Sequence, residues 1–160
     1  MTDKTFTTCL WLDNQAEEAA DYYTSIFPDS KIGRVVRYTE AGPGPAGTVM
    51  VVEFELNGQK FVALNGGPLF TFNESISFQI PCADQDEVDY YWNGLTRDGG
   101  QERRCGWVKD RYGVSWQVIP TVLTDMTGDP DPERSARATT AMLGMTKFDI
   151  AALQKAYDGG

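Results

Sequence analysis

Histidine is absent from this chain of 160 residues. No side chain therefore has an ordinary pKa near neutral pH, and mechanisms that depend on imidazole are excluded, among them Ser–His–Asp triads and Cys–His pairs. Histidine-rich metal sites are excluded for the same reason. Cysteine is scarce as well: Cys9, Cys82 and Cys105 show no CxxC spacing. They predict reduced thiols, not a disulfide framework or a zinc knuckle.

Basic charge and long apolar runs are also missing. The chain has 14 Lys and Arg against 23 Asp and Glu, a formal net charge of −9, which argues against binding to nucleic acid or to an anionic membrane surface. No apolar run approaches the length of a membrane span. The first four residues lead directly into a strand-like segment without a signal-peptide core. We therefore expect a cytoplasmic protein with no membrane or nucleic-acid partner.

The first half of the chain alternates strand and helix signals. Residues 5–12 predict a strand, and Asn14 with Glu17 three residues later predicts a capping box that begins a helix ending at Pro28. Residues 32–38 and 48–56 predict strands separated by a Gly/Pro loop, which we expect to be mobile. Asn57-Gly58 predicts a tight hairpin that returns as a strand over 60–65.

The second half repeats this order. Residues 75–81 predict a strand, Asp84 and Glu87 repeat the capping spacing, and QERRCGWV and GVSWQVI predict strands 101–108 and 113–119. The apolar stripe of the intervening helix comprises Val88, Tyr91, Trp92 and Leu95. We predict an α+β fold in which two tandem βαβββ units, 5–70 and 71–125, form curled mixed sheets around a cleft within one domain, 1–125. Residues 126–160 are expected to form a C-terminal helical extension, with helices over 133–143 and 147–157.

Four segments carry a resemblance to a known family: CLWLDNQAEEAADYYTSIFPDSKI, FVALNGGP, ISFQIPC and CGWVKDRYGVSWQVIPTVL. They resemble the vicinal oxygen chelate superfamily, which includes glyoxalase I, extradiol dioxygenases and the bleomycin- and fosfomycin-resistance proteins. The closer similarity is to its PhnB-like branch, often labelled 3-demethylubiquinone 3-methyltransferase-like. The resemblance implies ligand binding on the concave side of the sheets, and a homodimer whose units pair within a chain or between chains.

The superfamily's metal ligands lie on the first and last strands of each unit. Carried over strand by strand, they fall near Thr8, near Ala63 or Asn65, near Ser77 or Phe78, and at Gln117. Only Gln117 is a plausible ligand, whereas a divalent ion needs three or four good donors. We therefore expect no metal. We also expect no methyl-donor cofactor, because the segment after the first strand, Asp13–Ala16, contains no glycine.

Several polar residues are candidates for direct ligand contact. Gln117 alternates with Trp116 and Val118 and would face the cleft, where it would bind a ligand or form a cross-strand hydrogen bond. Asn65 ends a strand and would orient a polar substrate or cap the turn. Glu53 would act as a general base if burial raised its pKa, or would be an exposed strand acid.

Two further sets complete the candidate site. Ser77 and Gln79 share one strand face and would line the cleft wall or meet solvent, and Thr8 on the first strand is a further candidate for ligand contact. Trp107 is the best aromatic candidate for stacking against a flat ligand, with packing as its alternative role.

These observations lead us to predict a metal-independent protein that binds an aromatic or amphiphilic metabolite in the cleft between the sheets. The alternatives are an enzyme on the same scaffold (a lyase, isomerase or ring-modifying enzyme using Glu53), an assembly protein without a ligand, and a true methyltransferase.

Overall fold

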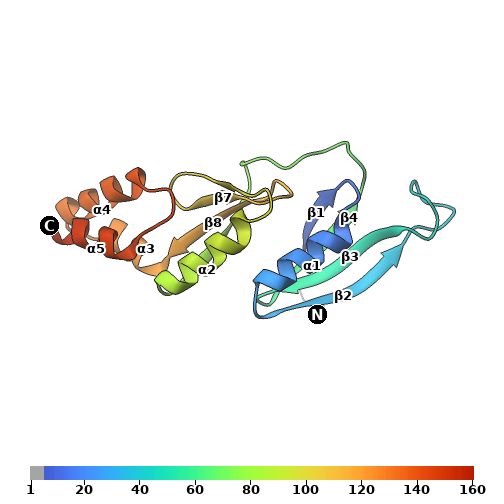
Figure 1. Ribbon diagram of the computed structural model, residues 1–160, viewed down its shortest axis with the longest axis horizontal. Helices are drawn as coiled ribbons and strands as arrows, with labels where there is room; N and C mark the ends of the chain where they lie inside the picture. Colours follow the sequence, from blue (N-terminus) through green and yellow to red (C-terminus); the bar gives the residue numbers. More distant parts are fainter. Residues whose placement is uncertain (1–5) are drawn as a thin grey trace. The chain divides into compact units, whose positions relative to one another are not determined.

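The structure is a computed structural model that describes residues 6–160 (Figure 1). The chain divides into two compact units, Met1–Thr71 and Phe72–Gly160. Each unit contains a four-stranded mixed sheet with a helix on one face, in the same βαβββ order. The predicted α+β fold with a repeated βαβββ unit is confirmed. No helix in the described part of the chain has the length and apolar character needed to cross a membrane.

The first unit forms a sheet of order β1-β4-β3-β2, in which β1 runs parallel to β4 and the other neighbours are antiparallel. Its elements are β1 (Thr8–Leu12), α1 (Ala16–Ile26), β2 (Ser30–Arg37), β3 (Val49–Leu56) and β4 (Gln59–Asn65). Asn57 and Gly58 both adopt positive φ between β3 and β4, as the predicted tight hairpin requires.

Alternation along β3 separates a covered face from an open face. Val52, Phe54 and Leu56 are buried on the face covered by α1 (Figure 1), whereas Glu53 and Glu55 alternate with them on the other face. Phe54 stacks on α1 and on the next strand, since its ring centroid lies 6.1 Å from that of Tyr23 and 5.3 Å from that of Phe61. Burying an aromatic side chain contributes about 1.5–3 kcal/mol, so these rings fix the helix on the sheet.

The second unit forms a sheet of order β5-β8-β7-β6, with β5 parallel to β8. Its elements are β5 (Ser77–Cys82), α2 (Gln85–Thr96), β6 (Gln101–Glu102), β7 (Trp107–Lys109), β8 (Ser115–Pro120), α3 (Thr121–Thr127), α4 (Pro132–Gly144) and α5 (Ile150–Asp158). Helix α2 lies against β5, β7 and β8, and the four residues of its predicted apolar stripe are all buried.

The two predicted capping boxes have different outcomes. The Asp84 carboxylate accepts the Glu87 N–H at 3.0 Å, so the second box is confirmed as the start of α2. The first box is wrong, because the residue before α1 is Gln15 and it makes no side-chain cap. Instead, the Asn65 Oδ1 atom at the end of β4 accepts the Ala16 N–H at 2.8 Å. A cap supplied from 49 residues away leaves no local spacing signal.

The hairpin between β7 and β8 is held by a buried carboxylate. Asp110, 3% exposed, accepts hydrogen bonds from the N–H groups of Tyr112 and Val114 and from Trp116 Nε1, at 2.9, 3.0 and 2.8 Å. Hydrogen bonds to an ionised acceptor are among the stronger ones in proteins. They fix the hairpin and hold the buried Trp116 ring by its indole N–H.

Two sequence predictions for the second unit need correction. The predicted strand 101–108 is interrupted, because Cys105 and Gly106 adopt φ of 57° and 75° and separate β6 from β7. Helix α3, which follows β8 without a break, was not predicted. The predicted helices 133–143 and 147–157 correspond to α4 and α5. These three helices share one buried cluster, formed by Leu123, Met126, Ala138, Phe148 and Leu153.

Candidate functional site

A row of polar side chains lies on the face of the second sheet opposite α2. Gln79 and Gln117 are register partners on β5 and β8, as are Ser77 and Ser115. The Gln117 Nε2 atom donates to Ser77 Oγ at 2.7 Å, and Gln79 Nε2 approaches Gln117 Oε1 at 3.5 Å. Three of the predicted contact residues therefore form one connected group. Gln117 makes the cross-strand hydrogen bond that was one of its two predicted roles, while it remains only half-buried.

An aromatic ring and an unpaired hydroxyl extend this group, which we call the polar face: Ser77, Gln79, Trp107, Ser115 and Gln117. Trp107 is half-buried and is the register partner of Gln117 on β7, so both side chains share this face. Ser115 is 2% exposed, and its Oγ has no hydrogen-bond partner among the described residues. A buried unpaired polar atom costs about 1–3 kcal/mol. Sequence reasoning missed Ser115, although its place two residues before Gln117 is a period-2 signal.

Glu53 lies in the first unit, on the open face of β3. Its carboxylate is ion-paired with Arg34 at 2.8 Å, and its side chain is 42% exposed. It borders a cavity of about 340 Å³ whose lining also includes Lys31, Glu55 and Lys60. The predicted general base required a buried carboxyl group. Within its own unit, Glu53 is instead partly exposed beside four other charged side chains.

Thr8 and Asn65 lie on the face that α1 covers. Thr8 is paired with Phe61, and Asn65 lies two positions beyond Ala63, which is fully buried. Besides accepting the Ala16 N–H, Asn65 donates from Nδ2 to the Val49 carbonyl at 3.0 Å. The amide of Asn65 thus joins three elements of the fold. These contacts are of the capping kind that was one of its two predicted roles, but Asn65 caps a helix and not a turn.

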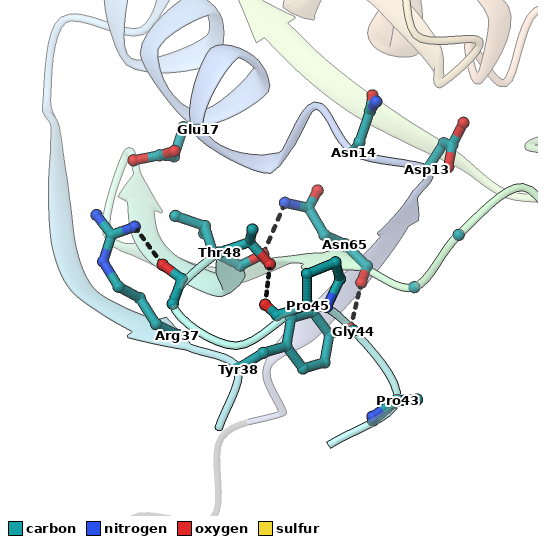
Figure 2. Close-up of a pocket in the computed structure, with 14 residues that line it drawn as sticks. Asp13, Asn14, Glu17, Arg37, Tyr38, Pro43, Gly44, Pro45, Thr48 and Asn65 are labelled. Atoms are coloured by element: carbon teal, nitrogen blue, oxygen red, sulfur yellow. Dashed lines mark hydrogen bonds between the residues drawn. The ribbon is translucent and has the colours of Figure 1, made fainter. Parts of the chain in front are cut away.

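A larger cavity, about 690 Å³, lies beside Asn65 at the beginning of α1 (Figure 2). Its walls include Asp13, Glu17 and Arg37 and the Gly/Pro loop between β2 and β3. The loop is held by Tyr38, whose hydroxyl donates to the Asn65 carbonyl at 2.6 Å. The side chain and the carbonyl of Asn65, which border this cavity, are thus both engaged in hydrogen bonds within the fold.

The donors on the polar face do not fit a divalent metal ion. They are neutral hydroxyl and amide groups, whereas transition-metal sites in proteins are built from carboxylate, imidazole or thiolate ligands. Within residues 6–160, no group of three or more Cys, Asp or Glu side chains is arranged to hold a metal. The chemistry available here is hydrogen bonding and aromatic stacking.

The thiols are also unsuited to nucleophilic chemistry. Burial first, and then the nearby Glu87 and Asp84 carboxylates, together raise the pKa of the Cys82 thiol to about 12. Thiolate nucleophiles need the opposite shift. Cys105 is half-buried, and its Sγ lies 3.7 Å from the Met142 carbonyl oxygen, so it is directed toward the C-terminal helices.

A methyl-donor site of the usual kind is likewise not formed. S-adenosylmethionine sites of the doubly wound type use a glycine-rich turn between a parallel strand and a helix. Here β1 and α1 are joined by Asp13, Asn14 and Gln15, and the first N–H of α1 is already occupied by Asn65. The residues at this turn therefore do not fit that cofactor.

The repeated βαβββ unit, with a helix on one sheet face and an open polar face, defines the class of protein as the vicinal oxygen chelate fold. Residues 4–119 match the profile of a family described as 3-demethylubiquinone-9 3-methyltransferase. A PhnB protein from Bacillus cereus is 35% identical, with 74% of this chain and 100% of that chain covered and a TM-score of 0.66. This chain therefore belongs to that PhnB-like family, as its resemblance implied.

More distant structures share the fold. The protein PA1353 from Pseudomonas aeruginosa is 17% identical, with 74% of this chain and 98% of that chain covered and a TM-score of 0.59. The fosfomycin-resistance protein FosX from Listeria monocytogenes, described as a complex with Mn(II) and a dihydroxypropylphosphonic acid, is 16% identical. The match covers 72% of this chain and 90% of the FosX chain, with a TM-score of 0.51. At these identities the similarity shows the fold alone. No curated protein matches this chain.

Proposed function

We propose that this chain binds a flat aromatic or amphiphilic small molecule on the polar face of its second unit without a metal ion. The observation that carries the proposal is the connected Ser77–Gln117–Gln79 group beside Trp107. A sheet face with no ligand to bind is usually apolar and covered, or polar and fully solvated. Here a half-buried amide and a half-buried indole occupy register-paired positions.

The chemistry of the polar face defines the ligand class. Gln117 offers an amide oxygen and Gln79 an amide nitrogen, whereas the Ser115 hydroxyl, unpaired among the described residues, is buried. A ligand hydroxyl or carbonyl group would hydrogen-bond to these amides, which a purely apolar ligand could not do. The Trp107 ring supplies a stacking surface, worth about 0.5–1.5 kcal/mol in addition to the buried area.

We further propose that the protein is a cytoplasmic homodimer. The open face of the first sheet carries the apolar side chains Val51, Val62 and Leu64, all half-buried in the single chain. A second copy of the chain would remove this apolar surface from water. Three free cysteines suit a reducing compartment. Sedimentation of wild-type protein and Val62→Lys tests the dimer: we expect a dimer for the former and a monomer for the latter, and a monomeric wild type would refute it.

The binding proposal is tested with 2-naphthol, a flat aromatic alcohol, and with cyclohexanol as a non-aromatic control. Protein labelled with 5-fluorotryptophan reports each of the four tryptophans as a separate fluorine resonance, assigned by single Trp→Phe variants. We expect 2-naphthol to shift the Trp107 resonance saturably and to leave the resonance of Trp92, a buried residue of α2, unchanged. Cyclohexanol should shift neither.

Variants assign the contacts. Gln117→Ala removes one hydrogen-bonding group, worth about 1 kcal/mol or about fivefold in affinity. Gln154→Ala is the matched control, because Gln154 is exposed on α5 and bonds only to Asp158 among the described residues. Absence of saturable 2-naphthol binding, or equal affinity in Gln117→Ala and wild type, would refute the proposed site.

A second candidate function is an enzyme on the same scaffold in which Glu53 acts as a general base. The cavity of about 340 Å³ beside Glu53 favours it, since it offers space for a substrate at the carboxylate. Molecules that co-purify with the protein would be incubated with the wild type and with Glu53→Gln, and products followed by mass spectrometry. Turnover that is lost in Glu53→Gln would support the enzyme, whereas no turnover by the wild type would count against it.

A further inference from the structure

The turn that precedes Trp107 is held by the C-terminal helical region. Cys105 and Gly106 both adopt positive φ, and the Trp107 N–H donates back to the Arg104 carbonyl at 3.2 Å. The N–H groups of Cys105 and Gly106 donate to the carbonyls of Met145 and Thr146 at 2.9 and 2.8 Å. Both acceptors belong to the segment between α4 and α5, residues 145–149, about forty residues further along the chain.

A buried ring closes this contact. Phe148 is 1% exposed, and its ring edge approaches Gly106 so closely that a Cβ atom there would lie 2.4 Å from the ring. The same Cβ atom would lie 2.7 Å from the Val118 carbonyl oxygen. Gly106 is therefore required twice, by its backbone conformation and by the contact with Phe148. The ring in turn restricts the position of the residue that leads into Trp107.

The segment is anchored on its other side to α2. The Gln85 side chain donates from Nε2 to the Phe148 carbonyl at 3.1 Å and accepts the N–H of Ile150, the first residue of α5, at 2.9 Å. Lys147 forms an ion pair with Asp89 at 2.6 Å. The segment 145–149 thus connects two fixed points, the turn before β7 and the exposed side of α2.

We propose that this segment is a positioning element for the ligand site, and that Phe148 is its principal positioning residue. The proposal rests on the proposed function, because Trp107 is the aromatic surface of the polar face. The N–H groups of residues 105 and 106 and the α-carbon of Gly106 are held in place by these contacts. The backbone conformation at the start of β7 is therefore fixed. The Trp107 ring is then held next to Gln117, its register partner. The family match ends at residue 119, so this function belongs to a part of the chain outside that match.

The test uses the full-length protein labelled with 5-fluorotryptophan, first without ligand. We expect Phe148→Ala to shift and broaden the Trp107 resonance, while the Trp11 resonance from the first unit stays unchanged. Leu153→Ala is the matched control. It removes another fully buried side chain from the same helical cluster, and it should leave the Trp107 resonance within its line width. Phe148→Leu, which keeps an apolar group against Gly106, should restore the wild-type position.

Ligand binding provides the second readout. Phe148→Ala should weaken 2-naphthol binding about fivefold, the share of affinity expected of one aromatic contact, whereas Leu153→Ala should not. If Phe148→Ala does not fold, Gln85→Ala tests the same idea from the α2 anchor and should produce the same shift of Trp107. An unshifted Trp107 resonance in the folded variant, or equal shifts in Phe148→Ala and Leu153→Ala, would overturn the positioning role. If wild-type protein does not bind 2-naphthol, the proposed function fails, while the ligand-free resonances still decide the positioning role.

Discussion

Replacing Asn65 by alanine should destabilise the first unit, because its amide joins the start of α1 to β3. The variant loses the hydrogen bond to the Ala16 N–H and the one to the Val49 carbonyl, at 2.8 and 3.0 Å. The first is equivalent to a helix N-cap, worth about 1 kcal/mol. The second is a partly buried hydrogen bond, also worth about 1 kcal/mol net. We therefore expect the free energy of unfolding to fall by about 2 kcal/mol, the sum of these two terms.

Asn14→Ala is the matched control, because Asn14 occupies the position that local spacing predicts as the cap. Its side chain makes no hydrogen bond within residues 6–160, so its removal should change the free energy of unfolding by less than about 0.5 kcal/mol. Asn65→Asp should lie between the two. It keeps the acceptor for Ala16 near a helix N-terminus, where negative charge is favourable, but it loses the donor to Val49.

The assay is urea unfolding of fluorotryptophan-labelled protein, followed at Trp11, the single tryptophan of the first unit. This resonance reports the first unit separately from the second. The reasoning would be refuted if Asn14→Ala cost as much stability as Asn65→Ala, since the cap would then be local. It would also be refuted if Asn65→Ala left the unfolding midpoint unchanged.

Three further predictions concern other parts of the chain. The pKa of Cys82 is raised to about 12, mainly by burial. This thiol should therefore resist a thiol reagent at pH 8 in the native state, and Cys82→Ser should leave native labelling unchanged. Labelling of Cys82 at the unfolded rate would contradict this. Hydrogen bonds from Lys147, and then Gln85, lower the pKa of Asp89. The resulting stabilisation is therefore present above the unfolded pKa of about 3.9 and is lost as the pH falls through the lower folded value. Asp89→Asn should reduce this acid dependence of Tm, and an identical acid profile would count against the ion pair. Gly44→Ala should displace Tyr38 and lower stability, because a Cβ atom at Gly44 would lie 2.5 Å from the Tyr38 ring. Gly47→Asn is the control and should not lower stability. A Cβ atom at Gly47 meets nothing within 4 Å, and asparagine tolerates the positive φ.

The elements predictable from sequence are those whose signals are local. The hairpin at Asn57-Gly58 and the cap at Asp84 were predicted because the residues that form them are neighbours in the chain. The same spacing at Asn14 and Glu17 misleads, because Asn65 competes for the first N–H of α1 from a distant strand. When a long-range hydrogen bond replaces a local cap, the sequence spacing is unchanged but no longer predicts the cap.

The candidate site shows the same division. Strand periodicity placed Ser77, Gln79 and Gln117 on one face, and the β5–β8 register brings them together. It did not predict the interruption at Cys105, because the carbonyl groups that stabilise this turn come from the segment between α4 and α5. Helix α3 was missed because it begins directly after β8 and the residue before it, Pro120, makes no side-chain cap, so no local signal marks its start.

Native mass spectrometry of untagged protein, with metal analysis of the same sample, tests the central claim most directly. A histidine tag must be avoided, because it would supply ligands that the chain lacks. The account predicts no stoichiometric divalent ion and a bound small organic molecule whose occupancy falls in Gln117→Ala but not in Gln154→Ala. A stoichiometric divalent ion that is lost in Gln117→Ala would contradict it, since the polar face would then be a metal site.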